Sequence, residues 1–128
     1  GAGGGGAAAS ILNLFAAVAL HALANDSGAS DTKAALDMRT RCWARELADH
    51  RVRSNAISPG IIDTPVFETM MPKEAVPAFL ESFSEQVPLG RVGQPVDIAR
   101  MAVFLSGPQS RWTTGAVIPV DGGLSLAS

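Results

Sequence analysis

The sequence predicts an α/β fold in which a parallel sheet is covered by helices on both faces. Short apolar segments of strand character alternate with longer helical segments along the 128 residues, and this alternation is typical of parallel strands joined by helical crossovers. Apolar residues make up 47% of the chain and charged residues 17%, which suits a folded domain and argues against disorder. A chain of this length holds one domain with a single core.

The amino-terminal part combines a low-complexity stretch with a strongly apolar one. Residues 1–9 are only Gly and Ala, and we expect them to form a flexible lead-in to a domain that spans residues 10–128. Residues 10–16 form a short apolar run, which periodicity alone assigns to neither a strand nor a helix. Residues 25–31 are rich in Ser, Gly and Asp, and this composition predicts a loop.

A helix and a strand are predicted next. Residues 32–50 hold many good helix formers, and Leu36, Trp43 and Leu47 fall on one face of that helix. Residues 52–57 form a predicted strand that ends at a Ser-Pro-Gly sequence. The chain turns there, because proline cannot donate to a strand ladder and glycine permits unusual backbone angles.

Three elements complete the chain. Residues 65–88 are predicted to be a helical segment punctuated by prolines. Residues 96–105 are predicted to be a short helix, since Pro95 suits a first helical turn and Asp97 suits the positive end of the helix dipole. Residues 116–120 are an apolar strand that ends at an Asp-Gly-Gly turn. The predicted order is strand, helix, strand, helical segment, helix, strand.

Charge and cysteine content argue against several classes of partner. The formal net charge of −2 gives no general attraction to nucleic acid or anionic membranes, and the arginines within 39–53 are interleaved with acidic residues, which favours a solvated helix face. The single cysteine, Cys42, rules out an internal disulfide, fits the reducing cytoplasm and is expected to be packed. Residues 7–24 nearly reach the length of a membrane span, but polar residues interrupt the run, so we expect buried core there.

Five sequence blocks follow one another in an order that resembles the short-chain dehydrogenase/reductase family, from the middle of that fold to its carboxyl end. They are the apolar run 10–14, the helix start 30–36, the N-A-I-S-P-G-x-x-x-T-P sequence 55–65, and the blocks 88–95 and 114–123. The resemblance implies a partial Rossmann-like fold, a doubly wound parallel sheet that corresponds to the second half of the family's domain.

The resemblance also implies hydride transfer between a nicotinamide cofactor, NAD or NADP, and a small-molecule carbonyl or alcohol. In the family a Tyr is the general acid/base, a Lys lowers its pKa and binds the nicotinamide ribose, and a Ser orients the substrate. Lys33 matches the Lys, whereas Ala29 stands at the Tyr position and Ala16 at the Ser position. The chain contains no tyrosine. The expected oxidoreductase is therefore impaired, and Lys33 is the surviving part of a cofactor site.

By the same resemblance, four residues that follow the second predicted strand would hold the nicotinamide side of the cofactor. Pro59 and Gly60 would form the floor of the site, and Ile62 would meet the carboxamide through its backbone. Thr64 would hydrogen-bond the carboxamide or a phosphate. A simple strand-ending turn is the alternative for each residue. The residue that chooses between NAD and NADP lies upstream in the family, so that choice stays open.

Residues 65–88 correspond to the family's substrate lid, a mobile apolar helix pair that closes over the substrate. Phe67, Met70 and Met71 would line it, and core packing is an equally open interpretation for each. Arg39 and Ser54 stand where the family usually has apolar side chains. We expect Arg39 to disturb helix packing and Ser54 to weaken a buried strand.

Two functions remain open. The chain is either an NAD(P)-dependent oxidoreductase, seen as its carboxyl-terminal portion, or a catalytically inactive subunit or truncated or engineered fragment that acts only in assembly. The second hypothesis rests on the family's two-fold interfaces and on the exposed edge of a half-sheet. Under the resemblance we expect a homo-oligomer, a dimer or tetramer, with no metal, no nucleic-acid partner and no membrane partner.

Overall fold

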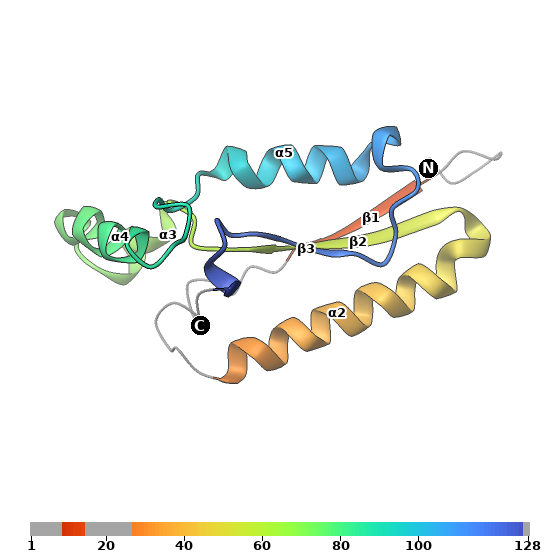
Figure 1. Ribbon diagram of the computed structural model, residues 1–128, viewed down its shortest axis with the longest axis horizontal. Coiled ribbons are helices and arrows are strands. Elements are labelled where there is room, and N and C mark those ends of the chain that lie inside the picture. Colours follow the sequence, from red (N-terminus) through yellow and green to blue (C-terminus); the bar gives the residue numbers. More distant parts are fainter. Residues whose placement is uncertain (1–8, 15–26, 127–128) are drawn as a thin grey trace.

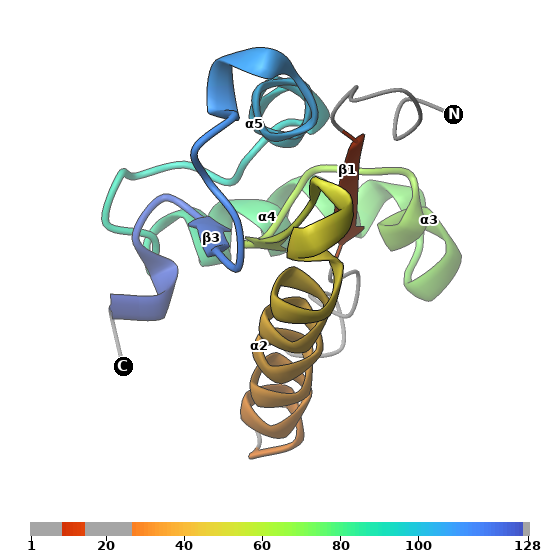
Figure 2. The ribbon, with the colours of Figure 1, turned by 90° about the vertical axis from the view of Figure 1, so that its right-hand side faces the viewer.

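A three-stranded parallel sheet is the centre of the computed structural model, which describes residues 9–14 and 27–126. Its strands lie in the order β1 (Ala9–Leu14), β2 (Val52–Pro59), β3 (Val117–Val120). Helices α2 (Ser27–Leu47) and α5 (Pro95–Ser106) lie on opposite faces of the sheet (Figure 1 and Figure 2). The predicted α/β fold and the predicted order of its elements are therefore confirmed.

The ambiguous apolar run 10–16 is a strand where it is described. β1 pairs in parallel with β2, from Ala9 opposite Val52 to Leu14 opposite Ile57. The strand thus begins on the last residue of the predicted lead-in; residues 1–8, 15–26 and 127–128 lie outside the described residues. In the described part of the chain, no helix is long and apolar enough to cross a membrane.

Helix α2 begins at Ser27, so the predicted loop 25–31 is wrong for residues 27–31. The preference of Ser, Gly and Asp for loops costs at most about 1 kcal/mol per residue in a helix. Extending a formed helix is favourable compared with nucleating one. Continuation of this 21-residue helix therefore outweighs the local preference of its first turn.

Residues four apart join α2 to the sheet. Leu36, Thr40 and Ala44 are buried, whereas Trp43 and Leu47, predicted on the same face as Leu36, are only half-buried. The Thr40 hydroxyl donates to the Leu36 carbonyl at 2.7 Å, so its burial leaves no unsatisfied donor.

Two residues on the outer face of α2 differ from what the sequence predicts. Cys42, predicted to be packed, is exposed, because α2 touches the sheet along one narrow stripe only. Arg39 is also exposed, and its guanidinium carbon lies 5.8 Å from the centre of the Trp43 ring. It therefore does not disturb the packing of α2 on the sheet. Arg41 pairs with Asp37 at 3.3 Å, as expected of a solvated helix face.

The central strand β2 is fully buried in its middle, at residues 54–57. The Asn55 side chain is satisfied there, because its amide donates to the Thr113 carbonyl at 3.0 Å and its oxygen accepts from the Ala116 N–H at 3.1 Å. The Ser54 hydroxyl has no hydrogen-bond partner among the described residues. The serine thus brings an unpaired polar atom into a buried strand.

Side chains from the sheet hold the carboxyl end of α5. The half-buried Arg53 donates to the carbonyls of Leu105 and Gly107, both at 3.0 Å, and of Thr113 at 3.1 Å. Two serine hydroxyls, one in β1 and one in the turn after α5, also donate to the Leu105 carbonyl. The Leu105 and Gly107 carbonyls lie at the negative end of the helix dipole, where a cation is favourable.

The 65–88 segment is helical, as predicted. It contains α3 (Val66–Met70), a 3-10 turn (Lys73–Ala75) and α4 (Val76–Ser84). Phe67 and Leu80 of this segment are buried together with Ile61 of the preceding turn and form the centre of an apolar cluster. The Phe79 ring lies 5.5 Å from the Phe67 ring and 4.9 Å from the Phe83 ring. α3 and α4 project beyond the carboxyl ends of the strands (Figure 1).

Candidate functional site

The carboxyl ends of β2 and β3 point to the left in Figure 1, toward α3 and α4, and α2 begins on the same side. In open parallel sheets, ligands bind outside the carboxyl ends of the strands. The turn that leaves β2, residues 59–64, occupies this edge and contains all four residues predicted to hold the nicotinamide. We therefore describe this turn and its neighbours as the candidate site.

Backbone contacts fix the beginning of the turn. The Gly60 N–H donates to the Val120 carbonyl at 2.9 Å. A Cβ atom on Gly60 would lie 2.6 Å from the Cα of Asp121. Two carbon atoms that are not bonded cannot approach so closely. The residue after β2 must therefore be glycine for β3 and its Asp-Gly-Gly turn to approach this closely.

The next residues form an isolated parallel bridge with Gly93. The Gly93 N–H donates to the Ile61 carbonyl at 2.8 Å, and the Asp63 N–H donates to the Gly93 carbonyl at 2.9 Å. In a parallel bridge the middle residue directs its own N–H and C=O to the opposite side. Accordingly, neither group of Ile62 has a hydrogen-bond partner within residues 9–14 and 27–126.

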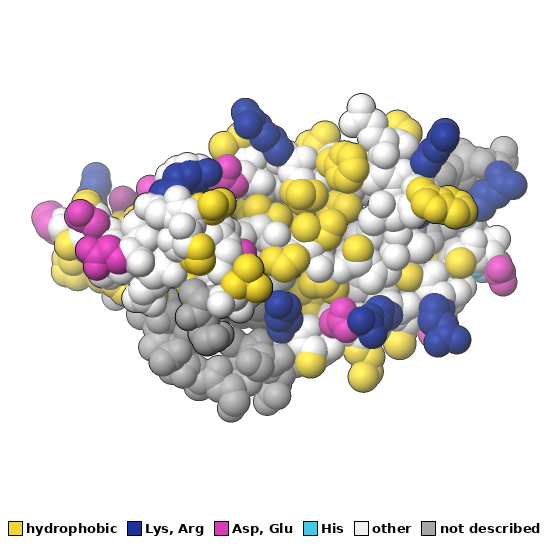
Figure 3. All heavy atoms as spheres, viewed as in Figure 1, with side chains coloured by type: hydrophobic (Ala, Val, Ile, Leu, Met, Phe, Trp, Pro, Cys, Tyr) yellow, Lys and Arg dark blue, Asp and Glu magenta, His cyan; other side chains and the backbone are white. Residues whose placement is uncertain are grey.

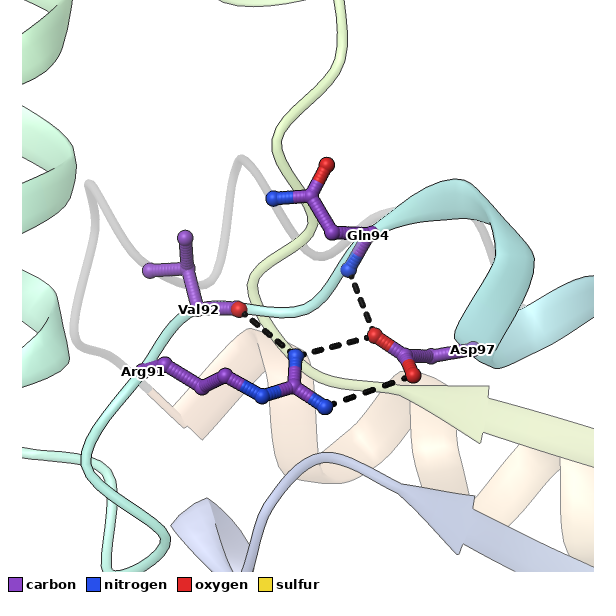
Figure 4. A network of polar contacts seen from close by, with 4 residues as sticks. All are labelled: Arg91, Val92, Gln94 and Asp97. Carbon is purple, nitrogen blue, oxygen red and sulfur yellow. Dashed lines mark hydrogen bonds and ion pairs between the residues drawn. The ribbon is translucent and has the colours of Figure 1, made fainter.

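Arg91 and Asp97 form a polar network beside this bridge (Figure 4). The Arg91 guanidinium binds both oxygens of the Asp97 carboxylate, at 3.0 and 3.4 Å, and also donates to the Val92 carbonyl at 3.1 Å. The Gln94 N–H donates to the same carboxylate at 2.7 Å, which caps the start of α5. The hydrogen bonds from Arg91 and then from Gln94 lower the pKa of Asp97, and the hydrogen bond with Asp97 raises the pKa of Arg91.

A cleft of about 310 Å³ lies between this network and the end of β3. It is lined by the residues around Ile62, by the 89–97 segment and by the turn after β3: Ile61, Ile62, Leu89, Arg91, Gly93, Asp97, Pro119, Val120, Asp121, Gly122 and Gly123. Both Asp121 carboxylate oxygens accept backbone N–H groups, from Gly123 at 2.8 Å and Ser125 at 3.1 Å. Asp121 therefore stabilises the turn. No group of three His, Cys, Asp or Glu side chains in the described ranges could hold a metal ion.

The structure brings Pro59, Gly60, Ile62 and Thr64 together on one turn, as their sequence spacing requires. Of these four residues, Ile62 lines the cleft. The Thr64 side chain is half-buried, and none of the described residues bonds its hydroxyl. Pro59 and Gly60 join β2 to this turn.

Lys33 lies on the second turn of α2 and is exposed. It does not line the cleft. Ala29, at the expected Tyr position, lies in the first turn of the same helix. Ala16, at the expected Ser position, lies outside the described residues.

The three residues predicted to line a lid have different environments. Phe67 is 2% exposed and packs within the apolar cluster of the 65–88 segment. Met71 is half-buried against the same cluster, whereas Met70 is 39% exposed. Core packing thus accounts for Phe67 and Met71, and Met70 is the accessible member of the three.

Sequence reasoning assigned no site role to Arg91 or to Gly93. Both fall in the 88–95 block, where a glycine and an arginine before a helix are compatible with a plain turn. The available signal was the acidic residue three positions after the helix N-cap, Gln94, which is typical of a capping interaction. Nothing in the sequence pairs that carboxylate with Arg91, six positions earlier.

Comparisons with known proteins identify the family of this chain. Residues 4–125 match the family described as Enoyl-(Acyl carrier protein) reductase. The chain is 36% identical over 117 residues to the 3-oxoacyl-(acyl-carrier-protein) reductase FabG of Thermotoga maritima, covering 91% of this chain and 46% of that protein. It is 35% identical over 118 residues to the L-xylulose reductase of Mesocricetus auratus, covering 92% and 47%.

Solved structures give the same result. A protein from Agrobacterium tumefaciens with bound NADP superposes with a TM-score of 0.73 at 30% identity, covering 94% of this chain and 48% of that one. The chain thus spans about half the length of the relatives that it matches. The match of one family across nearly all of the chain, together with this fold, shows that the chain belongs to the short-chain dehydrogenase/reductase family.

Proposed function

We propose that this chain forms the nicotinamide side of an NAD(P)-dependent oxidoreductase that acts on a small-molecule carbonyl or alcohol. The observation that carries the proposal is the Ile62 N–H at the carboxyl edge of the sheet, which has no partner among the described residues because Gly93 pairs with the residues on either side of it. Family membership and the NADP bound to a similar structure support the same cofactor class.

The donors at the end of β2 fit a nicotinamide group. The Ile62 N–H would donate to the carboxamide, the Thr64 hydroxyl would bind the carboxamide or a phosphate, and the exposed Lys33 would bind the ribose. When bound, the cofactor would supply or accept the hydride. The proposal concerns the nicotinamide end of the cofactor alone.

The chemical step is impaired in this proposal. Ala29 and Ala16 provide no proton donor, and the chain has no tyrosine. Loss of a positioned general acid/base typically lowers the rate by about 10²–10⁴. We therefore expect cofactor binding without measurable turnover, and we expect the double substitution Ala16→Ser and Ala29→Tyr to raise turnover of a carbonyl substrate by about 10²–10⁴. No gain in turnover would contradict this part of the proposal.

Cofactor titration tests the proposal directly. NADH and NADPH are titrated separately into the chain, and the fluorescence of the reduced nicotinamide is followed. Binding is expected, and Lys33→Ala should weaken it by about 10–100-fold, because hydrogen bonds to charged groups contribute about 1.5–3 kcal/mol. Lys73→Ala is the matched control, since Lys73 is equally exposed but lies on the 65–88 segment. Absence of binding at millimolar cofactor would refute the proposal for this chain.

A second candidate function is assembly, as an inactive subunit of a dimer or tetramer in the cytoplasm. Within the described residues, β1 and β3 each pair with one strand only, and an unpaired edge favours association. Apolar side chains also gather over α5 (Figure 3), where Val103 and Phe104 are exposed. Sedimentation should then give a discrete oligomer, and a clean monomer would count against this function.

A further inference from the structure

We propose that Arg91 and Asp97 are positioning residues that hold the Ile62 peptide in place through Gly93. The structural part of this inference concerns the free chain. Its consequence for the cofactor rests on the proposed function, in which the Ile62 N–H is a cofactor donor.

The Ile62 peptide depends on Gly93 for its position. The two hydrogen bonds of the bridge, from Gly93 to Ile61 and from Asp63 to Gly93, are 2.8 and 2.9 Å long. They hold the residues on both sides of Ile62 and leave Ile62 itself without a backbone bond in the described part of the chain. A shift of Gly93 would therefore carry the Ile62 N–H with it.

Gly93 in turn is held between two groups that bind one carboxylate. On one side, Arg91 donates to the Val92 carbonyl at 3.1 Å and to Asp97 Oδ2 at 3.0 Å. On the other side, the Gln94 N–H donates to the same Oδ2 at 2.7 Å. One oxygen at the start of α5 thus fixes both ends of the short segment that contains Gly93 (Figure 4).

The contact between Gly93 and Ile62 is also tight at the side-chain level. A Cβ on Gly93 would lie 2.6 Å from Ile62 Cδ1. Since that atom is the flexible end of a side chain, Gly93→Ala would displace the Ile62 side chain without breaking the backbone bridge. Gly93→Ala therefore distinguishes an effect of the Ile62 side chain from an effect of the Ile62 peptide.

A purely stabilising role for the ion pair makes a different prediction. The Arg91 and Asp97 side chains are 61% and 30% exposed, and exposed pairs contribute little to global stability. Under that interpretation, removal of Arg91 would change the hydrogen-exchange rates of all amides slightly and to the same extent. Under the positioning interpretation, the change is concentrated at the two N–H groups of the bridge.

Amide hydrogen exchange of the free chain distinguishes these interpretations. In Arg91→Gln the Asp63 and Gly93 N–H groups should exchange about threefold to tenfold faster, as loss of a weak bidentate pair implies. The Gly60 N–H, bonded to Val120, should be unchanged. Asp37→Asn breaks the exposed pair with Arg41 on α2 and is the matched control; it should leave all three amides unchanged. Equal exchange in Arg91→Gln and the wild type would overturn the proposal.

Cofactor affinity tests the consequence. In Arg91→Gln the Kd for the reduced cofactor should rise about threefold to tenfold. Arg91→Lys keeps the positive charge but loses the two-pronged guanidinium contact, so its Kd should lie between those of the wild type and Arg91→Gln. An unchanged Kd despite faster exchange would show that the Ile62 peptide does not serve the cofactor, and would overturn the consequence. If the wild type binds no cofactor, the proposed function fails, and the exchange experiment still decides whether Arg91 positions the bridge.

Discussion

Replacing Ser54 by alanine is expected to raise the free energy of unfolding. The Ser54 hydroxyl is fully buried in β2 and has no partner among the described residues. Arg53 donates to the end of α5, and both Arg53 and Asn55 donate to Thr113 in the loop after α5. Strand alternation therefore places Ser54 on the opposite face, which α2 covers. There it lies in the layer of Leu36, Thr40 and Ala44, which are buried with it.

The size of the expected change in the free energy of unfolding follows from the hydrogen bond that the Ser54 hydroxyl lacks. A buried hydroxyl without a partner costs about 1–3 kcal/mol. Removing one oxygen gives up a few packing contacts of about 0.1–0.2 kcal/mol each. Ser54→Ala should therefore stabilise the chain by about 1 kcal/mol, which raises Tm by about 3–6 °C in a domain of this size.

Ser110→Ala is a matched control because it removes the same atom from an equally buried serine. The Ser110 hydroxyl lies 2.7–3.1 Å from the carbonyls of Phe104, Leu105 and Gly107, so its loss should cost about 0.5–1.5 kcal/mol. Urea unfolding of both variants, with the m-value checked for constancy, should give changes of opposite sign. A Ser54→Ala variant that is no more stable than the wild type would refute the reasoning, since it would mean that the hydroxyl is satisfied.

Three further outcomes are expected. Gly60→Ala should lower the free energy of unfolding by about 1–3 kcal/mol, because its Cβ would meet the Asp121 backbone at 2.6 Å; urea unfolding measures this, and a neutral effect would contradict the close approach. The lowered pKa of Asp97 means that its contribution to stability is complete above the ordinary aspartate value of about 3.9 and is lost as the pH falls through the lower folded value. A carboxyl titration by NMR should show that midpoint below the ordinary value and show it rising in Arg91→Gln; a midpoint at the ordinary value in the wild type would count against the pairing. The exposed Cys42 should react with a thiol reagent in the native chain about as fast as in urea, and strong protection would contradict its exposure.

The order of elements and the parallel sheet could be predicted because apolar periodicity determines which segments can be buried. The start of α2 could not, because Ser27 and Gly28 prefer loops locally and only the length of the helix overrides that preference. The exposure of Cys42 could not be predicted either. Small residues lie on several faces of α2, so the sequence alone does not determine which face packs on the sheet.

The candidate site was predictable only in part. The turn 59–64 follows from the Ser-Pro-Gly sequence, but the outward direction of the Ile62 N–H depends on the bridge with Gly93, a contact across 31 positions. Phe67 illustrates the same difficulty, because an aromatic residue in a lid and one in a core have identical local sequence signals. Such choices depend on contacts that form only when the elements pack.

The side chain of Arg53 reaches from the central strand to the carbonyls of Leu105 and Gly107 at the end of α5 and to the Thr113 carbonyl in the loop that follows, so one guanidinium joins three segments of the chain. At the amino edge of the sheet, buried side-chain bonds such as this one tie strand, helix and turn together, and most substitutions there would leave polar groups unpaired. At the carboxyl edge, the turns are joined by backbone hydrogen bonds, and their close approach requires glycine at position 60. Both edges of the sheet therefore depend on particular residues, the amino edge on one cation and the carboxyl edge on one glycine.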